Sequence, residues 1–482
     1  MVIFCAPNKH QSYAYLLVVA VVFSMVLPLP GYGENLRNAL RSAYLKNPRL
    51  AAERSNLRAI DEQVPQALSS YRPSVTFSAD ASVRHQNVNP GHATATTSGE
   101  NMTYPTGYSL SLNQNIFDGL RTYNAVNEAE AAIKAGRAGL RATEQSVLLG
   151  AVTVFMDVVR DTEIVKLRET NVQALSRYHQ GTKDRLAVRE ATQTDLAQSR
   201  TRLAQAAYEL ELARVNLKAS RARYKRIVKH PPNRLTAPKP LVRLLPRTLI
   251  AARQQAEREN PDVLVAIYRE RAAHFNIKKI YGELLPALQL GASYSNGNDS
   301  YKETIDLQQG TGVITGTLSV PLYQRGLISS RVRKAKHLHV RAIKLVESAR
   351  DTAREAANAA WTRLHASRTQ LRTATLQVKS SKTALSGVRE EEKAGLRTIL
   401  DVLNAEQEFV NAQVLLANGR RDLIINAYTL LSTVGRLTAK HLALSTHNSK
   451  SNYDEVRQKW YGLSITHADG HREHFRAGFK EQ

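Results

Sequence analysis

The stretch Tyr-Ser-Leu-Ser-Leu-Asn-Gln-Asn-Ile, residues 108–116, alternates apolar side chains with small or polar ones, with Gln114 as the exception. Successive side chains of a β-strand point to opposite faces of the sheet, so this order gives one apolar and one polar face. A period of two over about ten residues is typical of a membrane-barrel strand, with lipid on one side and a wet lumen on the other. The pattern predicts a transmembrane strand over residues 107–116.

Three further segments have the same alternation and predict strands over residues 73–83, 287–295 and 311–320. The stretches 84–106 and 296–310 are rich in Gly, Ser, Thr and Asn, and we expect them to form loops between the strands. One alternating segment would be a weak indication, because hairpins of soluble proteins look similar. Four segments at matching places in the chain favour a barrel.

The four segments belong to two copies of one plan, because residues recur at a nearly constant displacement. Asn47-Pro48 recurs 213 positions later as Asn260-Pro261, and from Phe117 onward, which corresponds to Tyr323, the displacement is 206. A single change of displacement indicates one length difference between the copies. The predicted domains are a signal peptide over 1–33, a first repeat over 34–235, a linker over 236–245, a second repeat over 246–440 and a polar tail over 441–482.

Long helical stretches follow the second strand of each repeat. Large residues recur every seven positions in both copies, with small residues beside them: Leu196, Leu203, Leu210 and Leu217 in the first, and Val402, Phe409, Leu416 and Leu423 in the second. Such rows let helices approach closely in a coiled coil. A soluble antiparallel coiled coil would satisfy the rows equally well.

The expected helix lengths suggest a more specific arrangement. At 1.5 Å per residue, residues 119–184 would form a helix of about 98 Å. Residues 192–229 and 34–70 would form helices of about 57 Å and about 55 Å, which together match the long one. The predicted fold class is mainly α with a small β part: a long antiparallel coiled-coil α-barrel plus four transmembrane strands per chain.

The N-terminus has the features of a secretory signal peptide. An apolar run over residues 15–27 follows Lys9, and Gly31-Tyr32-Gly33 supplies the small residues that precede cleavage, predicted after Gly33. An uncleaved anchor is the alternative. No later run approaches the roughly 18 apolar residues of a membrane-spanning helix, so we expect any membrane crossing to use strands. The only cysteine, Cys5, lies before the apolar run, so the mature chain is expected to fold without disulfides.

The chain is strongly basic, with 67 Lys and Arg against 42 Asp and Glu, a formal net charge of +25. Such a balance favours an anionic partner, nucleic acid or lipid headgroups. Nucleic acid is the weaker interpretation, because the aromatic content is only 6% and the bases are spread along amphipathic patterns. The acid-free stretch 212–256 is a candidate contact for an anionic envelope polymer, with a solvated belt as the alternative. The cluster in 325–336 is predicted to contact anionic headgroups of outer-membrane lipid.

Four strands cannot close a barrel, and open sheet edges are not tolerated in lipid. Several chains must therefore share one barrel. Three chains would supply twelve strands.

Several motifs resemble the TolC family of outer-membrane efflux proteins, over nearly all of residues 34–440. The first repeat contributes Asn47-Pro48-Arg49-Leu50 and Ile116-Phe117-Asp118-Gly119. The second contributes Pro321-Leu322-Tyr323-Gln324-Arg325-Gly326 and, as the most specific motif, Gly395-Leu396-Arg397-Thr398-Ile399-Leu400-Asp401-Val402-Leu403.

The resemblance implies a homotrimer with a twelve-stranded barrel in the outer membrane of a Gram-negative cell and a helical tunnel in the periplasm. It also implies docking to a periplasmic adaptor (membrane fusion) protein and an inner-membrane efflux pump or ABC transporter. The function would be export of small molecules, as in drug efflux, or of proteins, as in type I secretion. The sequence does not name the cargo.

The resemblance further implies a periplasmic gate formed by Thr194, Asp195, Arg397, Asp401 and Asn404. Arg397 would donate to Thr194 and Asp195 in the closed state. Threefold symmetry would turn Asp401 into a ring of carboxylates that favours cations. The alternative is that Arg397 and Asp401 form a simple i, i+4 helix pair.

The hairpin turns are expected to contact the adaptor. The residues concerned are Val188, Arg189, Ala191 and Thr192 in the first turn and Gly395, Leu396 and Thr398 in the second. Three positions depart from the family pattern: Arg189 replaces a usual glycine, Asn115 a common proline, and Asn404 a frequent carboxylate. These changes leave the fold intact and alter the expected adaptor fit and gate electrostatics.

The chain shows no phosphate loop, no Ser-His-Asp order and no CxxC pair, so we predict no enzyme activity, catalytic residue, cofactor or metal. His467, His471 and His474 have helix-compatible spacing for a metal, but a solvated tail is the preferred interpretation. The run Glu390-Glu391-Glu392 is interpreted as a charged helix face beside a turn. The main alternative from another class is a secreted or membrane-anchored structural coiled coil without a pore.

Overall fold

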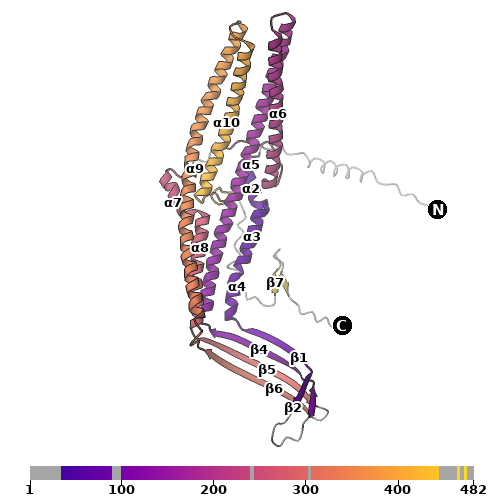
Figure 1. Ribbon diagram of the computed structural model, residues 1–482, viewed down its shortest axis with the longest axis vertical. Coiled ribbons are helices and arrows are strands. Elements are labelled where there is room, and N and C mark those ends of the chain that lie inside the picture. Colours follow the sequence, from indigo (N-terminus) through magenta and orange to yellow (C-terminus); the bar gives the residue numbers. More distant parts are fainter. Residues whose placement is uncertain are drawn as a thin grey trace, which may run out of the picture. The chain divides into compact units, whose positions relative to one another are not determined.

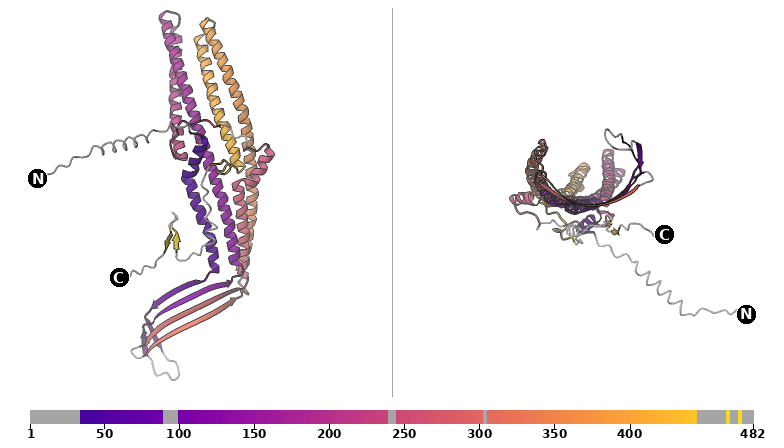
Figure 2. Two further views of the ribbon diagram at one scale, coloured as in Figure 1. Left: turned by 180° about the vertical axis from the view of Figure 1, so that it is seen from behind. Right: turned by 90° about the horizontal axis from the view of Figure 1, so that it is seen from below.

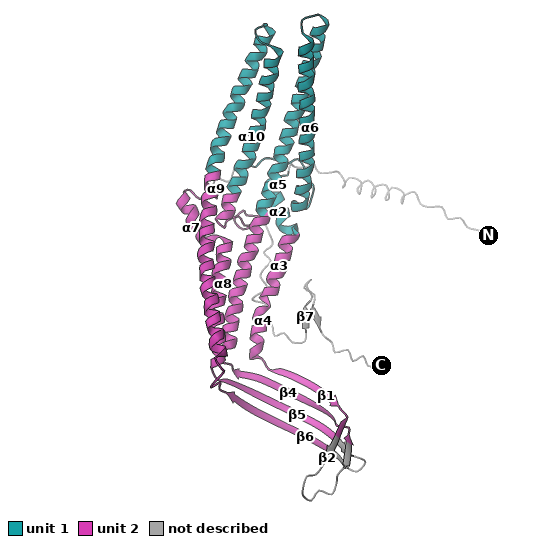
Figure 3. Ribbon diagram, in the orientation of Figure 1, with its two compact units in different colours: residues 1–47, 148–243, 364–428 teal, residues 48–147, 244–363, 429–482 magenta. Residues whose placement is uncertain are grey.

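The computed structural model describes residues 34–88, 99–238, 244–301, 305–444, 464–466 and 472–474. The predicted signal peptide and the tail residues His467 and His471 lie outside this part of the chain. The chain divides into two units (Figure 3). Unit 1 comprises residues 1–47, 148–243 and 364–428, and unit 2 comprises residues 48–147, 244–363 and 429–482.

Unit 2 contains an antiparallel sheet in the order β1-β4-β5-β6 (Figure 1). The strands are β1 (Ser74–Ala81), β4 (Thr106–Phe117), β5 (Ala287–Tyr301) and β6 (Ile305–Ser319). The sheet curves into an open arc, as the right-hand view of Figure 2 shows. The alternating segments of both repeats therefore lie in one sheet, with the second strand of the first repeat beside the first strand of the second repeat.

The sheet extends into stretches that we expected to be loops. A short hairpin, β2 (Arg84–Val88) and β3 (Gly99–Thr103), continues from β1, and β3 pairs with β5 through Thr103 and Tyr301. Strands β5 and β6 pair up to Tyr301↔Ile305, so the loop expectation for 296–310 is wrong over most of its length. Ladder hydrogen bonds use only the main chain, so polar and small residues pair as readily as apolar ones once a register is set.

The predicted opening helix over 34–70 is interrupted, which corrects the expectation of one rod. It consists of α2 (Leu36–Lys46), α3 (Pro48–Asp61), α4 (Gln63–Leu68) and a 3₁₀ turn (Ser69–Tyr71). Asn47 is extended, with φ −73° and ψ 122°, because the proline that follows disfavours helical geometry at the residue before it. The second repeat breaks in the same way at Asn260, between α7 (Leu249–Glu259) and α8 (Pro261–Tyr281).

Two long helices and two shorter ones complete the repeats. The long ones are α5 (Arg121–Ala187) and α9 (Leu327–Lys393), of 67 residues each, and the returning ones are α6 (Gln193–Val228) and α10 (Ile399–Thr433). In α5 one 18-residue window reaches a mean hydropathy of 1.3, enough by length and composition to cross a membrane. The expectation that no run after the signal peptide approaches a membrane-spanning length is therefore wrong by length and composition. The window is 56% buried within the protein, and buried core helices pass the same test.

The helices pack through small clusters of large and small side chains. In unit 1, Leu175, Ala206 and Leu403 form one buried cluster from three different helices. In unit 2, Val64 packs against Ala129 and Ile133. Alanine at these positions lets neighbouring backbones approach closely, as the heptad rows of the sequence predict.

The turns that lead into the long helices share one conformation in the two repeats. Gly119 and Leu120 have positive φ before α5, and Arg325 and Gly326 have positive φ at the corresponding positions before α9. Gly119 also lies against Gly282 of unit 2, where a Cβ added at Gly119 would be 2.3 Å from the Gly282 carbonyl oxygen. This backbone contact joins the start of α5 to the turn that precedes β5.

Candidate functional site

The turn between α5 and α6 is closed by backbone hydrogen bonds. The N–H of Arg189 donates to the Leu186 carbonyl at 3.1 Å, and the N–H of Glu190 donates to the Arg185 carbonyl at 2.8 Å. Arg189 has φ +63°, a left-handed conformation. Helix ends usually place glycine at such a position, because other residues pay a steric cost there.

The turn between α9 and α10 repeats this geometry 206 positions later. The N–H of Gly395 donates to the Glu392 carbonyl at 2.9 Å, and the N–H of Leu396 donates to the Glu391 carbonyl at 2.8 Å. Gly395 has φ +78°. The two hairpin turns therefore have one backbone design, with arginine in the first copy where the second has glycine.

Both returning helices begin with a reciprocal side-chain cap. Asp195 N–H donates to Thr192 Oγ1 at 3.1 Å, and the Thr192 N–H and hydroxyl donate to Asp195 Oδ2 at 3.0 and 2.7 Å. Asp401 and Thr398 make the same three bonds at 3.3, 3.0 and 2.8 Å. Such a capping box satisfies N–H groups that the helix start leaves free.

The caps define the charge state of both predicted gate aspartates. Hydrogen bonds from the Thr192 hydroxyl and N–H lower the pKa of Asp195, and those from the Thr398 N–H and hydroxyl lower the pKa of Asp401, because they stabilise the ionised carboxylate. All donors to these carboxylates in the described part of the chain reach Oδ2, so Oδ1 of each has no protein partner there. Each aspartate keeps one oxygen available.

The other predicted gate residues have partners of their own. Arg397 Nε donates to Glu391 at 2.9 Å, and no hydrogen bond or ion pair in the described residues joins Arg397 to Thr194, Asp195 or Asp401. Asn404 accepts a hydrogen bond from Arg202 Nη2 at 2.8 Å. Thr194 is exposed. The predicted contact from Arg397 to Thr194 and Asp195 is thus not made within one chain, and it stays a prediction for an assembled channel.

Two ion pairs with buried glutamates lie behind the turns and were not predicted from the sequence. Arg185 donates to Glu392 at 2.6 Å, joining α5 to α9, and Arg389 donates to Glu406 at 2.5 Å, joining α9 to α10. The Glu392 side chain is only 5% exposed. Burial also raises the pKa of nearby Tyr178. The interpretation of Glu390-Glu391-Glu392 as a charged helix face beside a turn is therefore wrong for Glu392, which is buried, whereas Glu390 and Glu391 are exposed.

A signal for the burial of Glu392 was present in the sequence. Counting back by sevens from Glu392 gives Leu385, Val378, Leu371 and Leu364, an apolar heptad row. Leu385 and Leu364 are both buried. The row predicts that the next position also faces the helix interface, whatever residue occupies it.

The predicted adaptor-contacting residues are largely accessible in the two turns. Val188 and Leu396, both large and apolar, are 65% and 78% exposed. Arg189, Thr192, Gly395 and Thr398 are exposed, and Ala191 is half-buried. Two exposed apolar side chains on the hairpin turns suit contact with a protein partner.

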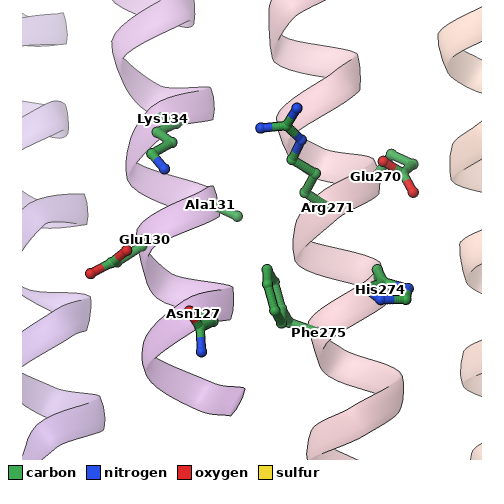
Figure 4. Close-up of a pocket in the computed structure, with 8 residues that line it drawn as sticks. All are labelled: Asn127, Glu130, Ala131, Lys134, Glu270, Arg271, His274 and Phe275. Atoms are coloured by element: carbon green, nitrogen blue, oxygen red, sulfur yellow. The ribbon is translucent and has the colours of Figure 1, made fainter. Parts of the chain in front are cut away.

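A separate cavity of about 500 Å³ lies between α5 and α8 in unit 2 (Figure 4). Arg271 and Phe275 reach from α8 toward α5, whereas Glu270 and His274 lie on the other side of α8. The lining contains no Ser, Thr or Cys, so His274 has no hydroxyl or thiol to activate there. Among the described residues no group of three or more His, Cys, Asp or Glu is placed to hold a metal ion.

The hairpin architecture, the four-stranded sheet and the repeat define a class of protein. A family model described as outer membrane efflux protein matches residues 39–227 and 252–436, so the chain belongs to this family. It is an outer-membrane efflux channel protein with its helical part in the periplasm. The structural coiled coil without a pore is not favoured, and relatives in the family are channels rather than enzymes.

Particular relatives support this assignment. The chain is 35% identical over 453 residues to the outer membrane efflux protein BepC of Brucella suis, covering 93% of this chain and 96% of that protein. It is 25% identical to the outer membrane protein TolC of Escherichia coli over 438 residues, 87% of this chain and 85% of that one.

Solved structures show the same fold. The Campylobacter jejuni CmeC outer membrane channel superposes with a TM-score of 0.74 at 18% identity, over 88% of this chain and 89% of that one. The Vibrio cholerae outer membrane protein VceC gives 0.69 at 18% identity, over 83% and 96%.

Proposed function

We propose that three copies of this chain form a twelve-stranded barrel and a periplasmic tunnel through which cargo leaves the cell. The observation that carries the proposal is the open sheet of unit 2. Strands β1 and β6 each pair on one side only within the described residues. Their free edges require partners in lipid, which a neighbouring copy of the chain supplies.

The side chains of the sheet support a membrane location for these strands. Phe77, Ile314 and Leu318 are among the large apolar residues that the strands expose. A continuous exposed apolar surface of this kind is unfavourable in water and favourable in a hydrocarbon layer. Electrophoresis of the outer-membrane extract tests the assembly. We expect the chain to migrate as a trimer that heating converts to the monomer. A monomer under mild extraction would contradict the proposal.

We further propose that Asp401 lines the mouth of the tunnel as a threefold ring. Its Oδ2 is held by Thr398, so the carboxylate is fixed in place while Oδ1 remains available to passing ions. A ring of three carboxylates in a narrow aqueous pore favours cations. Thr194, Asp195, Arg397 and Asn404 complete the proposed gate.

Planar-bilayer recording of the purified channel tests the gate. We expect Asp401→Asn to reduce cation selectivity, because asparagine keeps a capping oxygen and removes the charge. Glu190→Gln is the control, since it removes one negative charge at an exposed position of the first turn that lies outside the proposed gate, and it should leave ion preference unchanged. Arg397→Ser combined with Asp195→Ala is expected to raise open probability. Unchanged conductance and ion preference in these variants would refute the gate assignment.

The exposed hairpin turns support a periplasmic adaptor protein and an inner-membrane efflux pump or ABC transporter as partners. The relatives divide between efflux and secretion: BepC is named an efflux protein, and the Pseudomonas aeruginosa relative AprF an alkaline protease secretion protein, 27% identical over 45% of each chain. Both cargo classes follow from this likeness. Dye efflux and protease secretion, measured in a host that lacks its own channel, separate them.

The turns offer a specific test of adaptor docking. Leu396→Asp places a charge on the more exposed apolar side chain without disturbing the turn backbone, so we expect loss of adaptor co-purification with normal trimer yield. Ala197→Asp, which adds the same charge at an exposed position about one turn into α6 and outside the proposed gate, serves as the control. Retained adaptor binding in the Leu396 variant would remove the turn from the docking surface.

A further inference from the structure

The junction between β6 and α9 places solvent-exposed apolar side chains next to basic residues in the sequence. Leu322 and Tyr323 are 93% and 86% exposed. Four basic residues follow within fourteen positions and are also exposed: Arg325, Arg333, Lys334 and Lys336. We call these six residues the junction patch. All six belong to unit 2.

The four cations of the junction patch have no hydrogen-bond or ion-pair partner among the described residues. Arg331, which lies between them in sequence, is paired with Glu283. Glu283, the acid that Arg331 contacts, is therefore already paired. The remaining positive charges are concentrated at the start of α9 without local compensation.

Arg325 occupies a backbone position where glycine would be easier to accommodate. Its φ is +53°, whereas Gly119, the corresponding residue of the first repeat, adopts φ +70° without a side chain. Left-handed geometry carries a steric cost for any residue with a Cβ. The turn itself does not require arginine, because glycine forms it in the other repeat.

The first repeat shows that the fold does not require positive charge here. Displaced by 206 positions, Arg333, Lys334 and Lys336 correspond to Asn127, Glu128 and Glu130. Neutral and acidic residues thus occupy the same helical positions at the start of α5. The basic character belongs to one of the two junctions only.

We propose that the junction patch binds anionic phospholipid headgroups at the periplasmic surface of the outer membrane. This inference rests on the proposed membrane barrel, since β6 ends at Ser319 and only two residues separate it from the patch. Leu322 and Tyr323 enter the interfacial layer, and the long basic side chains extend to the phosphates. One base near an anionic surface strengthens binding about fivefold.

The test uses a tryptophan at the patch and lipids that quench it. Tyr323→Trp is made in a chain whose own tryptophans are replaced by Trp361→Phe and Trp460→Phe. The trimer is reconstituted with brominated phosphatidylglycerol or brominated phosphatidylcholine. The ratio of tryptophan quenching in the first lipid to that in the second gives the relative affinity of the site for the two headgroups. Phe117→Trp reports in the same way from the corresponding junction of the first repeat.

We expect at least a fivefold preference for phosphatidylglycerol at position 323 and a ratio near one at position 117. Replacing Arg325, Arg333, Lys334 and Lys336 by glutamine should bring the ratio at 323 close to one. The control variant makes the same glutamine replacements at four exposed basic residues of α6, and it should leave the ratio at 323 unchanged. These residues are Arg221, Arg223, Lys225 and Arg226. Free glycerol phosphate at millimolar concentration should not compete.

Several outcomes would overturn the inference. These are equal quenching by both lipids at 323, a preference that survives the fourfold glutamine variant, the same preference at 117, or full competition by glycerol phosphate. Ile314→Trp, on the exposed face of β6, separates this failure from failure of the barrel. Quenching at 314 but not at 323 refutes the lipid site alone, and absence of quenching at both refutes the membrane barrel.

Discussion

Arg185 and Glu392 form an ion pair at 2.6 Å that connects the two helical hairpins of unit 1 just behind their turns. The arginine is on α5 and the glutamate on α9, 207 residues apart in sequence. The glutamate is almost fully buried, so it depends on this partner for compensation of its charge. The hydrogen bond to Glu392 is also the main reason that the pKa of Arg185 is raised.

We expect this pair to hold the hairpins of one chain together in the closed channel. Arg185→Ala should weaken the contact by about 1 to 2 kcal/mol per chain. This is less than the loss of a fully buried ion pair, because the arginine is half exposed and solvent screens its charge. Because the contact would be weakened in all three chains of the channel, we expect the open probability to rise at least tenfold. Single-channel recording in planar bilayers measures the change.

Two further variants sharpen this prediction. Lys393→Ala removes a cation from an exposed i, i+3 pair with Glu390 on the same helix and should leave gating unchanged. The charge exchange Arg185→Glu with Glu392→Arg should restore part of the closed state. If Arg185→Ala and Lys393→Ala gate alike, the pair has no role in closure.

The left-handed Arg189 predicts a stabilising substitution. Arg189→Gly should stabilise the first turn by about 1 kcal/mol, because glycine avoids the Cβ clash at φ +63°. The reciprocal change Gly395→Ala should destabilise the second turn by a similar amount. Hydrogen exchange of the turn amides measures both effects. Faster exchange in the Arg189 variant would show that the arginine side chain contributes more than its backbone costs.

The two capping boxes predict a response to acid. Because the folded-state pKa values of Asp195 and Asp401 lie below the usual 3.8, the caps stabilise the helices fully above about pH 4. This contribution is lost as the pH falls through the lowered pKa. Hydrogen exchange, corrected for the intrinsic exchange rate at each pH, measures the protection of the amides at the starts of α6 and α10. This protection should not change between pH 7 and pH 5.

Below pH 4 the same amides should lose protection. The double variant Asp195→Asn with Asp401→Asn should remove this acid dependence, since asparagine does not titrate. Equal loss of protection in the variant would assign the acid effect to other carboxylates.

The contact between Gly119 and Gly282 predicts a severe effect from adding one methyl group. A Cβ on Gly282 would lie 2.4 Å from the Gly119 carbonyl oxygen, so Gly282→Ala must displace backbone. We expect a loss of about 2 kcal/mol or more in the free energy of unfolding. Gly139→Ala on α5 is the matched control: its Cβ meets nothing within 4 Å, and alanine should stabilise the helix. Thermal unfolding of the purified protein compares the two.

Periodic parts of the fold were predictable from the sequence, and irregular parts less so. The period of two identified the alternating segments, and the repeat placed them correctly relative to the helices that follow. The extension of β5 and β6 to Tyr301 and Ile305 was missed, because pairing of polar residues leaves no apolar period. The break at Asn47 was also missed, although the rule for residues before proline applies there.

The sequence by itself determined the class of this protein. The repeat, the alternating strands and the heptad rows depend on short-range spacing, which local backbone geometry converts directly into strand faces and helix faces. Those features suffice for a family assignment, and they do not depend on which helices become neighbours.

Only the tertiary structure decided how the charges of the hairpins are used. Arg397 pairs with Glu391, Asp195 and Asp401 cap their own helices, and Glu392 is buried against Arg185. An ionised side chain takes the partner that lies within reach at the lowest cost in solvation, and that partner can be two hundred residues away. The spacing of two residues along the sequence does not give their distance in space, so the pairing of charges is known only once the helices are packed.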